Sequence, residues 1–218
     1  MRKVFFIVLL LGPLKTMSQL PNKNVSFLAL GDSYTIGESV SEQERWPNQL
    51  ADSLRAHGMK ISRPTLVATT GWRTDDLKNA IAKASLKNEY GLVSLLIGVN
   101  NQYQGKPLAQ YAVEFEDLLR TAIALAQGKK ENVFVVSIPD YGFTPFGKEK
   151  QTTITAAIDQ FNATNRQIAE RLGITYFFIT DITRRALTQP DLMAADGLHP
   201  SGKMYSLWVE RMVKGLVK

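Results

Sequence analysis

Apolar runs and amphipathic segments alternate along this chain. The runs are bounded by glycine or polar residues, and their length is typical of strands that are buried on both faces. They lie at 25–30, 65–69, 92–97, 132–138 and 174–179. Between and after them, apolar residues recur every three or four positions, which predicts helices with one buried face. These segments are 46–56, 74–87, 107–127, 152–172 and 201–217.

Strands that alternate with helices indicate a parallel sheet covered by helices on both faces. We therefore predict an α/β fold, in the form of a three-layer α/β/α sandwich. Because parallel strands are joined by right-handed crossovers, five strands favour the flavodoxin-like order 2-1-3-4-5. We find no internal repeat or linker, so residues 19–218 are predicted to form a single domain. Ligands of such sheets bind beyond the carboxyl ends of the strands, and functional residues are expected there.

Local signals predict how several helices begin and end. Thr74 and Ser201 stand at the start of amphipathic segments, and their hydroxyls can accept a hydrogen bond from the first turn, so both are predicted N-caps. His57 and Gly58 follow the segment 46–56. An imidazole near a helix C-terminus is favoured by the helix dipole, and we therefore interpret His57 as structural.

The first 18 residues have the pattern of a secretory signal peptide. Basic residues at positions 2 and 3 precede an apolar run that ends at Pro13, and Thr16 and Ser18 supply the small side chains expected before a cleavage site. The run is shorter than the roughly 20 residues that span a bilayer. We predict cleavage after Ser18, a secreted or periplasmic protein, and no stable membrane insertion after cleavage. A buried first strand or an uncleaved anchor is the alternative.

The composition of the 218 residues restricts the chemistry. Hydrophobic residues make up 44% of the chain, enough for a sizeable core. The lack of cysteine excludes disulfides, thiolate metal sites and a cysteine nucleophile, and two histidines leave little for a zinc site. We predict no metal and no cofactor. Removal of residues 1–18 takes away three basic residues and no acidic one, which lowers the formal net charge from +6 to +3. Without a basic block, no nucleic-acid partner is predicted.

Three residues could form a nucleophile, a base and an orienting acid. Ser33 follows the first predicted strand, and Asp196 and His199 lie three positions apart in the loop before the last helix. A nucleophilic serine needs a base, and the base needs an acceptor for its second ring nitrogen. Two of these residues also have a simpler interpretation, since Ser33 and Asp196 could serve as helix caps with no catalytic role. No G-x-S-x-G elbow is present, which argues against an α/β-hydrolase.

Two further residues at strand ends could form an oxyanion hole with the backbone of Ser33. Gly71 follows the second predicted strand, and a glycine lets a backbone N–H approach a ligand closely. Asn100 follows the third predicted strand and carries a carboxamide donor. Either residue alone is typical of a turn, so the joint arrangement carries the prediction.

These residues lie in four blocks that resemble the SGNH (GDSL-type) hydrolase superfamily, which is named for a Ser, a Gly, an Asn and a His. The blocks appear in the family's order over residues 25–202. They are Gly31-Asp32-Ser33, Gly71, Gly98-Val99-Asn100 and Asp196-Gly197-Leu198-His199. Two positions depart from the common pattern. Tyr34 stands where Leu is usual, and Asn101 stands where many members have Asp.

The resemblance implies a metal-free serine hydrolase that cleaves carboxylic esters or thioesters through an acyl-enzyme, as esterases, lipases and lysophospholipases do. Ser33 is then the nucleophile, His199 the base and Asp196 its orienting acid, with Ser33, Gly71 and Asn100 in the oxyanion hole. The expected partner is a small-molecule, lipid or glycan ester. The substrate pocket is predicted to include Trp72 and Tyr103, and its walls are sought in 38–46, 72–73, 102–104 and 141–146.

Other functions fit parts of the sequence. A carbohydrate O-acetyl esterase would use the same mechanism. A flavodoxin-type flavin-binding protein could use residues 33–37 as a phosphate loop, although Asp196 and His199 would then have no role. An inactive glycan-binding module is a third alternative. Residues 142–148 have the frame of a nucleotide-binding loop, but Glu149 replaces the hydroxyl that holds magnesium, so nucleotide binding is rejected.

Overall fold

The computed structural model describes residues 24–217, and the predicted signal peptide at 1–18 lies outside these residues. Five parallel strands form one sheet in the order β2-β1-β3-β4-β5, which confirms the predicted topology. The strands are β1 (Phe27–Gly31), β2 (Thr65–Ala68), β3 (Leu92–Leu96), β4 (Val133–Val136) and β5 (Thr175–Phe177).

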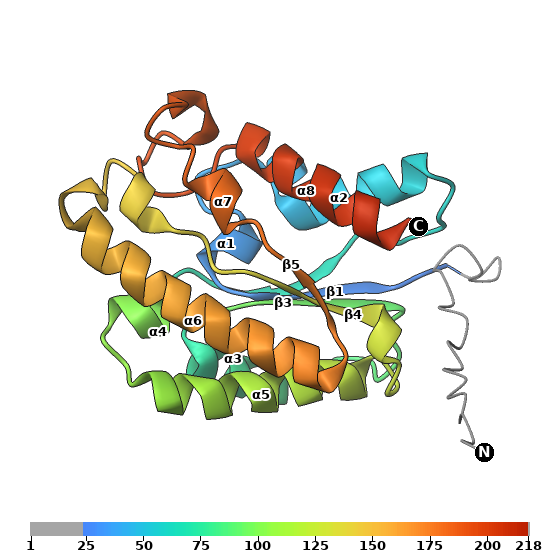
Figure 1. The fold of residues 1–218 in the computed structure, drawn as a ribbon. Helices are drawn as coiled ribbons and strands as arrows, with labels where there is room; N and C mark the ends of the chain where they lie inside the picture. Colours follow the sequence, from blue (N-terminus) through green and yellow to red (C-terminus); the bar gives the residue numbers. More distant parts are fainter. Residues whose placement is uncertain (1–23, 218) are drawn as a thin grey trace, which may run out of the picture.

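Helices cover both faces of the sheet, as predicted for a three-layer sandwich. Helices α1, α2, α7 and α8 lie on one face, and α3, α5 and α6 lie on the other (Figure 1). Their bounds are α1 (Ser33–Ile36), α2 (Trp46–Ala56), α3 (Thr74–Lys83), α4 (Val99–Tyr103), α5 (Leu108–Leu125), α6 (Gln151–Leu172), α7 (Thr180–Thr183) and α8 (Gly202–Leu216). Short 3-10 turns lie at η2 (Glu42–Glu44), η3 (Lys130–Asn132), η4 (Tyr141–Phe143), η5 (Lys148–Lys150) and η6 (Pro190–Leu192).

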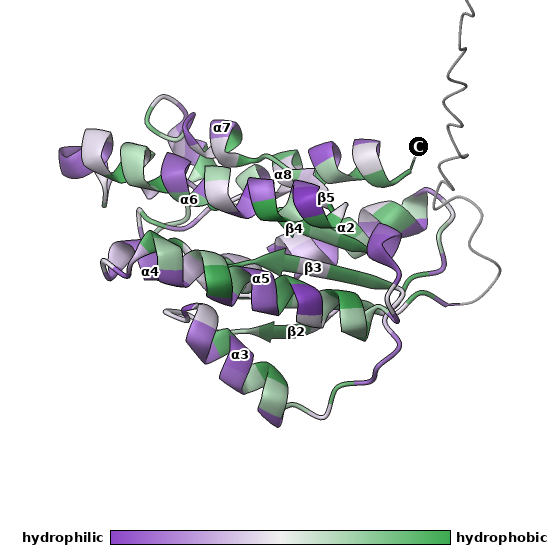
Figure 2. Cartoon of the chain, turned by 60° about the horizontal axis from the view of Figure 1, so that its bottom comes forward, coloured by the Kyte–Doolittle hydropathy of each residue, from purple (hydrophilic) through white to green (hydrophobic). Residues whose placement is uncertain are grey.

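The core forms on both sides of the three central strands. Every residue of β1, β3 and β4 is buried, whereas the edge strands β2 and β5 are partly exposed. In Figure 2 the strands are green because their residues are apolar, and the helices on both sides of the sheet carry green (apolar) and purple (polar) residues. On one face Trp46 of α2 packs with Phe27 and Phe134, with ring centroids 6.3–6.4 Å apart. Such packing of large rings dominates the apolar area that folding removes from water.

Most predicted helix ends lie within two residues of the observed ones, but α3 ends at Lys83 instead of the predicted 87, and its N-cap also differs. Ser201 is the N-cap of α8, as predicted, and its hydroxyl accepts from the Met204 amide. Thr74 is instead the first residue of α3, and Arg73 is the N-cap. The Thr74 prediction was wrong because its hydroxyl is held by Glu114 and by Asn101 from other elements. A tertiary partner outweighs the local preference of threonine for the cap.

The two ends of the sheet differ in what they carry. The segments that follow β1, β2, β3 and β4 meet at the carboxyl edge, where α4 lies at the left of Figure 1. The start of β1 and the C-terminal end of α8 lie at the opposite, amino edge. Within residues 24–217, no helix combines the length and the apolar character needed to cross a bilayer.

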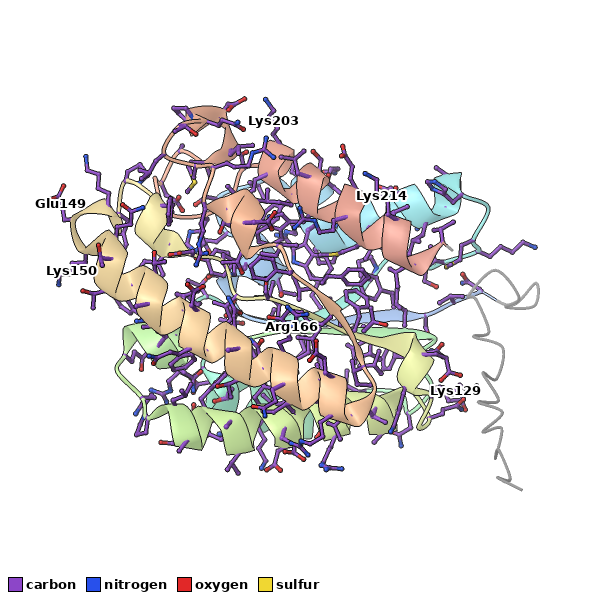
Figure 3. The ribbon with its side chains drawn as sticks, in the orientation of Figure 1. Lys129, Glu149, Lys150, Arg166, Lys203 and Lys214 are labelled. Atoms are coloured by element: carbon purple, nitrogen blue, oxygen red, sulfur yellow. The ribbon has the colours of Figure 1, made fainter. Side chains whose placement is uncertain are left out.

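Charged side chains are spread over many elements rather than gathered on one. Figure 3 labels Lys129, Arg166 and Lys214 on different parts of the surface. Several of the basic side chains form salt bridges with acidic ones, such as Arg166 with Glu170 at 2.8 Å. The positive charge is therefore partly neutralised within single helices.

Candidate active site

The first strand delivers Ser33 to the carboxyl edge of the sheet. Strand β1 ends at Gly31, and Ser33 is the first residue of α1. A Cβ at Gly31 would come within 2.2 Å of the Thr35 hydroxyl and 2.5 Å of the Leu96 carbonyl oxygen. Only glycine fits this tight turn between strand and helix. Because Ser33 opens the helix, its N–H has no partner within α1.

The N-cap of α1 is the buried residue Asp32. One carboxylate oxygen accepts from the Tyr34 amide at 3.0 Å, and among the described residues the other oxygen has no hydrogen-bond partner. Burial raises the pKa of this carboxyl from 3.8 to about 7, although its backbone hydrogen bonds act in the opposite direction. A group that is costly to ionise thus lies directly before Ser33.

His199 and Asp196 form a hydrogen-bonded pair in the loop before α8. The His199 Nδ1 lies 2.6 Å from Asp196 Oδ2. Asp196 Oδ1 accepts from the amides of Leu198 and His199, both at 2.9 Å. Since a carboxylate only accepts, Nδ1 carries the proton and Nε2 is left as the acceptor. The arrangement is that of an orienting acid and a base.

The surroundings of Asp196 keep its carboxyl ionised. Partial burial alone would raise its pKa, but the Ser39 hydroxyl, the amides of His199 and Leu198, and the His199 ring together hold the pKa well below its usual range. The Ser39 hydroxyl donates to Asp196 Oδ2 at 2.5 Å. Ser39 was predicted only as part of the pocket wall 38–46, and its contact with Asp196 was missed because 157 residues separate the two.

The proposed oxyanion donors Gly71 and Asn100 lie in the loop after β2 and in helix α4. Gly71 has a φ of +83°, which favours glycine, and its N–H donates to no protein acceptor among residues 24–217. The Asn100 carboxamide donates to the Trp72 carbonyl oxygen at 2.9 Å. One of its two N–H bonds is enough for this contact, so the second is available to a ligand. The contact also ties α4 to the loop after β2.

Asn101 has a different environment from its neighbour Asn100. It is 1% exposed. Its carboxamide accepts from the Thr74 amide at 3.1 Å and donates to the Thr74 hydroxyl at 2.6 Å. Both ends of the side chain are therefore occupied inside the protein, which leaves Asn100 as the carboxamide that lines the pocket.

A pocket of about 180 Å³ opens at this edge. Predicted site residues from four separate segments of the chain line it together with apolar and aromatic side chains. The lining residues are Ser33, Tyr34, Thr70, Gly71, Val99, Asn100, Tyr103, Tyr141, Phe146, Leu198 and His199. The structure thus brings Ser33, Gly71, Asn100 and His199 to one cavity, with Asp196 behind His199.

Three aromatic rings form one wall of this pocket, and we call them the aromatic wall. Tyr103, Tyr141 and Phe146 have ring centroids 6.0–6.3 Å apart. Tyr103 is 59% exposed and Phe146 is 54% exposed. Exposed rings this close to a reactive centre provide apolar surface that a substrate can cover.

A buried carboxylate anchors the turn that carries Tyr141. Asp140 is fully buried and accepts from the Gly142 amide at 3.0 Å, from Thr155 at 2.8 Å and from the Arg184 guanidinium at 2.9 Å. Arg184 also pairs with Asp159, at 2.5 Å, so the guanidinium bridges two carboxylates. The turn that carries Tyr141 is therefore anchored to α6 and to the segment that follows α7.

The other sequence-predicted residues lie outside the pocket. Trp72 packs partly buried against the core and is not among the lining residues, so its predicted role in substrate binding gains no support. His57 lies at the exposed end of α2, with Nδ1 2.8 Å from the Ser53 carbonyl oxygen, in line with a structural role. No cluster of three or more metal-ligating side chains occurs in the described part of the chain.

The family model of the GDSL-like lipase/acylhydrolase family matches residues 29–207. This range contains all four blocks of the site. An arylesterase from Vibrio mimicus is 26% identical over 199 residues, which cover 88% of this chain and 88% of that protein.

Solved structures share the fold at lower identity. The psychrotrophic esterase EstA from Pseudoalteromonas sp. has a TM-score of 0.62 and 19% identity, with 87% of this chain and 94% of EstA covered. The acetylxylan esterase Axe2 from Geobacillus stearothermophilus has a TM-score of 0.69 and 18% identity, with 88% and 94% covered. TesA has a TM-score of 0.66 and 18% identity, with 88% and 98% covered.

These matches favour ester hydrolysis over the flavodoxin-type alternative, whose fold is similar but whose chemistry needs no acid–base pair. They cover most of the chain, and they agree with the grouping of a serine, a histidine and an asparagine at one sheet edge. The chain belongs to the GDSL-like lipase/acylhydrolase family, and it is a serine esterase of the SGNH type.

Proposed function

We propose that Ser33 is the nucleophile, His199 the general base and Asp196 the acid that orients it. The Ser33 Oγ forms a bond to the ester carbonyl carbon, and its proton passes to Nε2 of His199. The π electrons of the carbonyl move to its oxygen, which becomes negative. Asp196 stabilises the imidazolium that forms and does not itself take up the proton.

The second half of the cycle reverses these transfers. Collapse of the tetrahedral intermediate breaks the bond to the leaving alcohol, and the Nε2 proton passes to the alcohol oxygen. Water then attacks the acyl-Ser33 carbonyl and gives a proton to Nε2, and the proton returns to Ser33 Oγ as the acid leaves. No metal or organic cofactor takes part in this scheme.

Ser33, Gly71 and Asn100 supply the donors of the proposed oxyanion hole. Within residues 24–217, the N–H of Ser33 at the start of α1, the N–H of Gly71 and the second N–H of Asn100 have no protein acceptor, so they can receive the negative oxygen. Such preorganised donors stabilise charge that develops only in the transition state.

The observation that carries this proposal is the short contact between His199 and Asp196 beside a pocket that Ser33 also lines. The contact fixes the tautomer of the base and directs its free nitrogen away from Asp196. An inactive glycan-binding module would have no use for this arrangement.

For the substrate we propose a small carboxylic ester with a short acyl chain and an apolar or aromatic leaving group. The aromatic wall and Leu198 supply apolar surface, and Tyr103 keeps its proposed role in substrate binding. The relative from Vibrio mimicus is named an arylesterase, which agrees with this chemistry. Carbohydrate O-acetyl esters are the second candidate, because Axe2 is an acetylxylan esterase with the same fold and aromatic rings also stack on sugars.

A panel of esters distinguishes these substrates. Phenyl and p-nitrophenyl esters with acyl chains from acetyl to long-chain are compared with acetylated xylo-oligosaccharides and lysophospholipids. We expect the highest kcat/KM for short-chain aryl esters. A preference for acetylated sugars would support the second candidate, and a preference for lysophospholipids would contradict both.

Replacement of Ser33 tests the proposed mechanism. Ser33→Ala removes the attacking atom, so we expect kcat to fall by at least about 10⁴-fold while the folded structure persists. An organophosphonate should label Ser33 and no other serine. EstA is inhibited by monoethylphosphonate, which makes this probe suitable. Labelling at Ser201 or Ser206 instead, or activity retained in Ser33→Ala, would contradict the mechanism.

We also propose that residues 1–18 are removed on export and that residues 19–218 form one secreted or periplasmic domain. The basic and apolar pattern of the first residues supports this proposal. N-terminal sequencing of the exported protein should begin at Gln19. Recovery of intact Met1 would indicate an anchor or a protein that is not exported.

A further inference from the structure

The segment that follows α1 contacts both sides of the site. Gly37 is the C-cap of α1, and the Glu38 carboxylate accepts a hydrogen bond from the Thr70 hydroxyl, next to Gly71. One residue later, the Ser39 hydroxyl donates to Asp196 Oδ2 at 2.5 Å. Neither residue lines the pocket. The segment directly after α1 therefore contacts both the loop that carries Gly71 and the loop that carries Asp196 and His199.

Ser39 holds this position in an unfavourable backbone conformation. Its φ is +64°, a left-handed value that side chains with a Cβ rarely adopt. Among the described residues, Gln127 is the only other non-glycine residue with a positive φ. A non-glycine residue that keeps a positive φ beside a candidate active site suggests that its side chain has a function at that site.

Ser39 donates to the same oxygen of Asp196 that accepts from the His199 ring. Asp196 Oδ2 accepts from both the Ser39 hydroxyl and His199 Nδ1, whereas Oδ1 accepts only from backbone amides. The Asp196 side chain is 31% exposed. Water would otherwise compete for Oδ2, so a hydroxyl bonded to it in addition to the His199 ring limits the positions that this oxygen can take.

We infer that Ser39 is a positioning residue, which holds the Asp196 carboxylate in the orientation that directs His199 toward Ser33. The inference rests on the proposed roles of Ser33, His199 and Asp196. Glu38 supports it by fixing the adjacent part of the segment to Thr70. Ser39 itself touches neither the substrate pocket nor the reacting atoms.

Replacement by glycine separates positioning from stability. Ser39→Gly removes the hydroxyl and relieves the left-handed strain, so we expect kcat to fall about three- to tenfold with KM unchanged, while Tm stays equal or rises. The matched control is Gln127→Gly at the end of α5, where φ is +58° and the side chain is far from the site in sequence and fold. It should keep Tm equal or higher and leave kcat unchanged. A structural role for Ser39 predicts instead a lower Tm together with the lower activity.

A conservative variant and a double variant complete the test. Ser39→Asn keeps a donor and tolerates a positive φ, so it should retain more of the activity than Ser39→Gly. In an Asp196→Asn background, Ser39→Gly should cause little further loss of kcat, because both changes act through one carboxylate.

Failure of the proposed mechanism and failure of the positioning role of Ser39 would give different results. If Asp196→Asn keeps full activity, the proposed mechanism fails. If Asp196→Asn is impaired but Ser39→Gly keeps kcat within twofold of the unmodified enzyme, or loses activity only with a lower Tm, the mechanism stands and the positioning role of Ser39 is overturned.

Discussion

The two sides of the active site differ in how many of their hydrogen bonds are already made. On the acid–base side, Asp196 accepts four hydrogen bonds from Ser39, Leu198 and His199 in the free protein. On the oxyanion side, the Gly71 N–H has no protein acceptor among residues 24–217, and Asn100 uses one N–H to hold itself against the Trp72 carbonyl.

This difference matches the charge that each side handles. The Asp196 carboxylate is charged throughout the proposed cycle, so its partners can be present from the start. The oxyanion exists only in the transition state and the tetrahedral intermediate, and donors that were satisfied beforehand would have to be released at a cost. One side is complete before the substrate binds, and the other is completed by the reaction. The following variants test this distinction.

The largest loss of kcat among these variants is expected on the acid–base side. Asp196→Asn keeps the shape of the side chain but offers an amide where His199 needs a carboxylate, so the ring can take the wrong tautomer. We expect kcat to fall by roughly 10⁴-fold with little change in KM, measured with a short-chain aryl ester. A loss smaller than that of Asn100→Ala would contradict the assignment of Asp196 as the orienting acid.

A smaller effect is expected on the oxyanion side. Asn100→Ala removes one donor that acts only in the transition state, so kcat should fall by roughly 10²–10³-fold while KM changes little. Tm should change only slightly, because the contact with the Trp72 carbonyl is the single protein hydrogen bond of this carboxamide among the described residues.

Asn101→Ala is the internal control for Asn100. The Asn101 side chain is buried and bonded twice to Thr74, so its removal leaves the buried Thr74 amide without its acceptor, whereas the Thr74 hydroxyl keeps its bond to Glu114. We expect a loss of about 1–3 kcal/mol in the free energy of unfolding, and kcat per folded molecule close to normal. A larger kcat loss at Asn101 than at Asn100 would place the oxyanion donor one residue further along the chain.

The last comparison concerns the pH dependence of stability at Asp32, whose environment is the reverse of that of Asp196. Its pKa is raised to about 7 in the folded protein, so between pH 4 and pH 7 the unfolded chain is ionised at this position and the folded protein is not. Stability is therefore lost as the pH rises through this range. Asp32→Asn keeps the N-cap acceptor and removes the ionisation. Its Tm, relative to the unmodified protein, should rise more at pH 8 than at pH 4, and an equal difference at both pH values would contradict the raised pKa.

The sequence was sufficient for the sheet and for the grouping of four candidate site residues in one pocket. The apolar runs predicted the strands because three of them are buried on both faces. The blocks placed Ser33, Gly71 and Asn100 after strands whose carboxyl ends converge, and His199 in the loop before the last helix. The order of strands could be predicted because the handedness of crossovers leaves few alternatives.

The features that could not be predicted depend on contacts between distant segments. Ser39 reaches Asp196 only because the chain turns left-handed after α1, and no local pattern marks that turn. Thr74 looks like an N-cap until its partners Glu114 and Asn101 are known. Trp72 follows β2 as expected, but its ring packs toward the core while its carbonyl holds Asn100.

The separation of the two sheet edges has a practical consequence for using this esterase on a support. The start of β1 and the end of α8 both lie at the amino edge, opposite the pocket (Figure 1). A tag or a resin attached at either of these positions would leave the substrate entrance facing the solution. Attachment through lysines would orient the molecules at random, since Lys129, Lys150 and Lys203 lie on different parts of the surface (Figure 3).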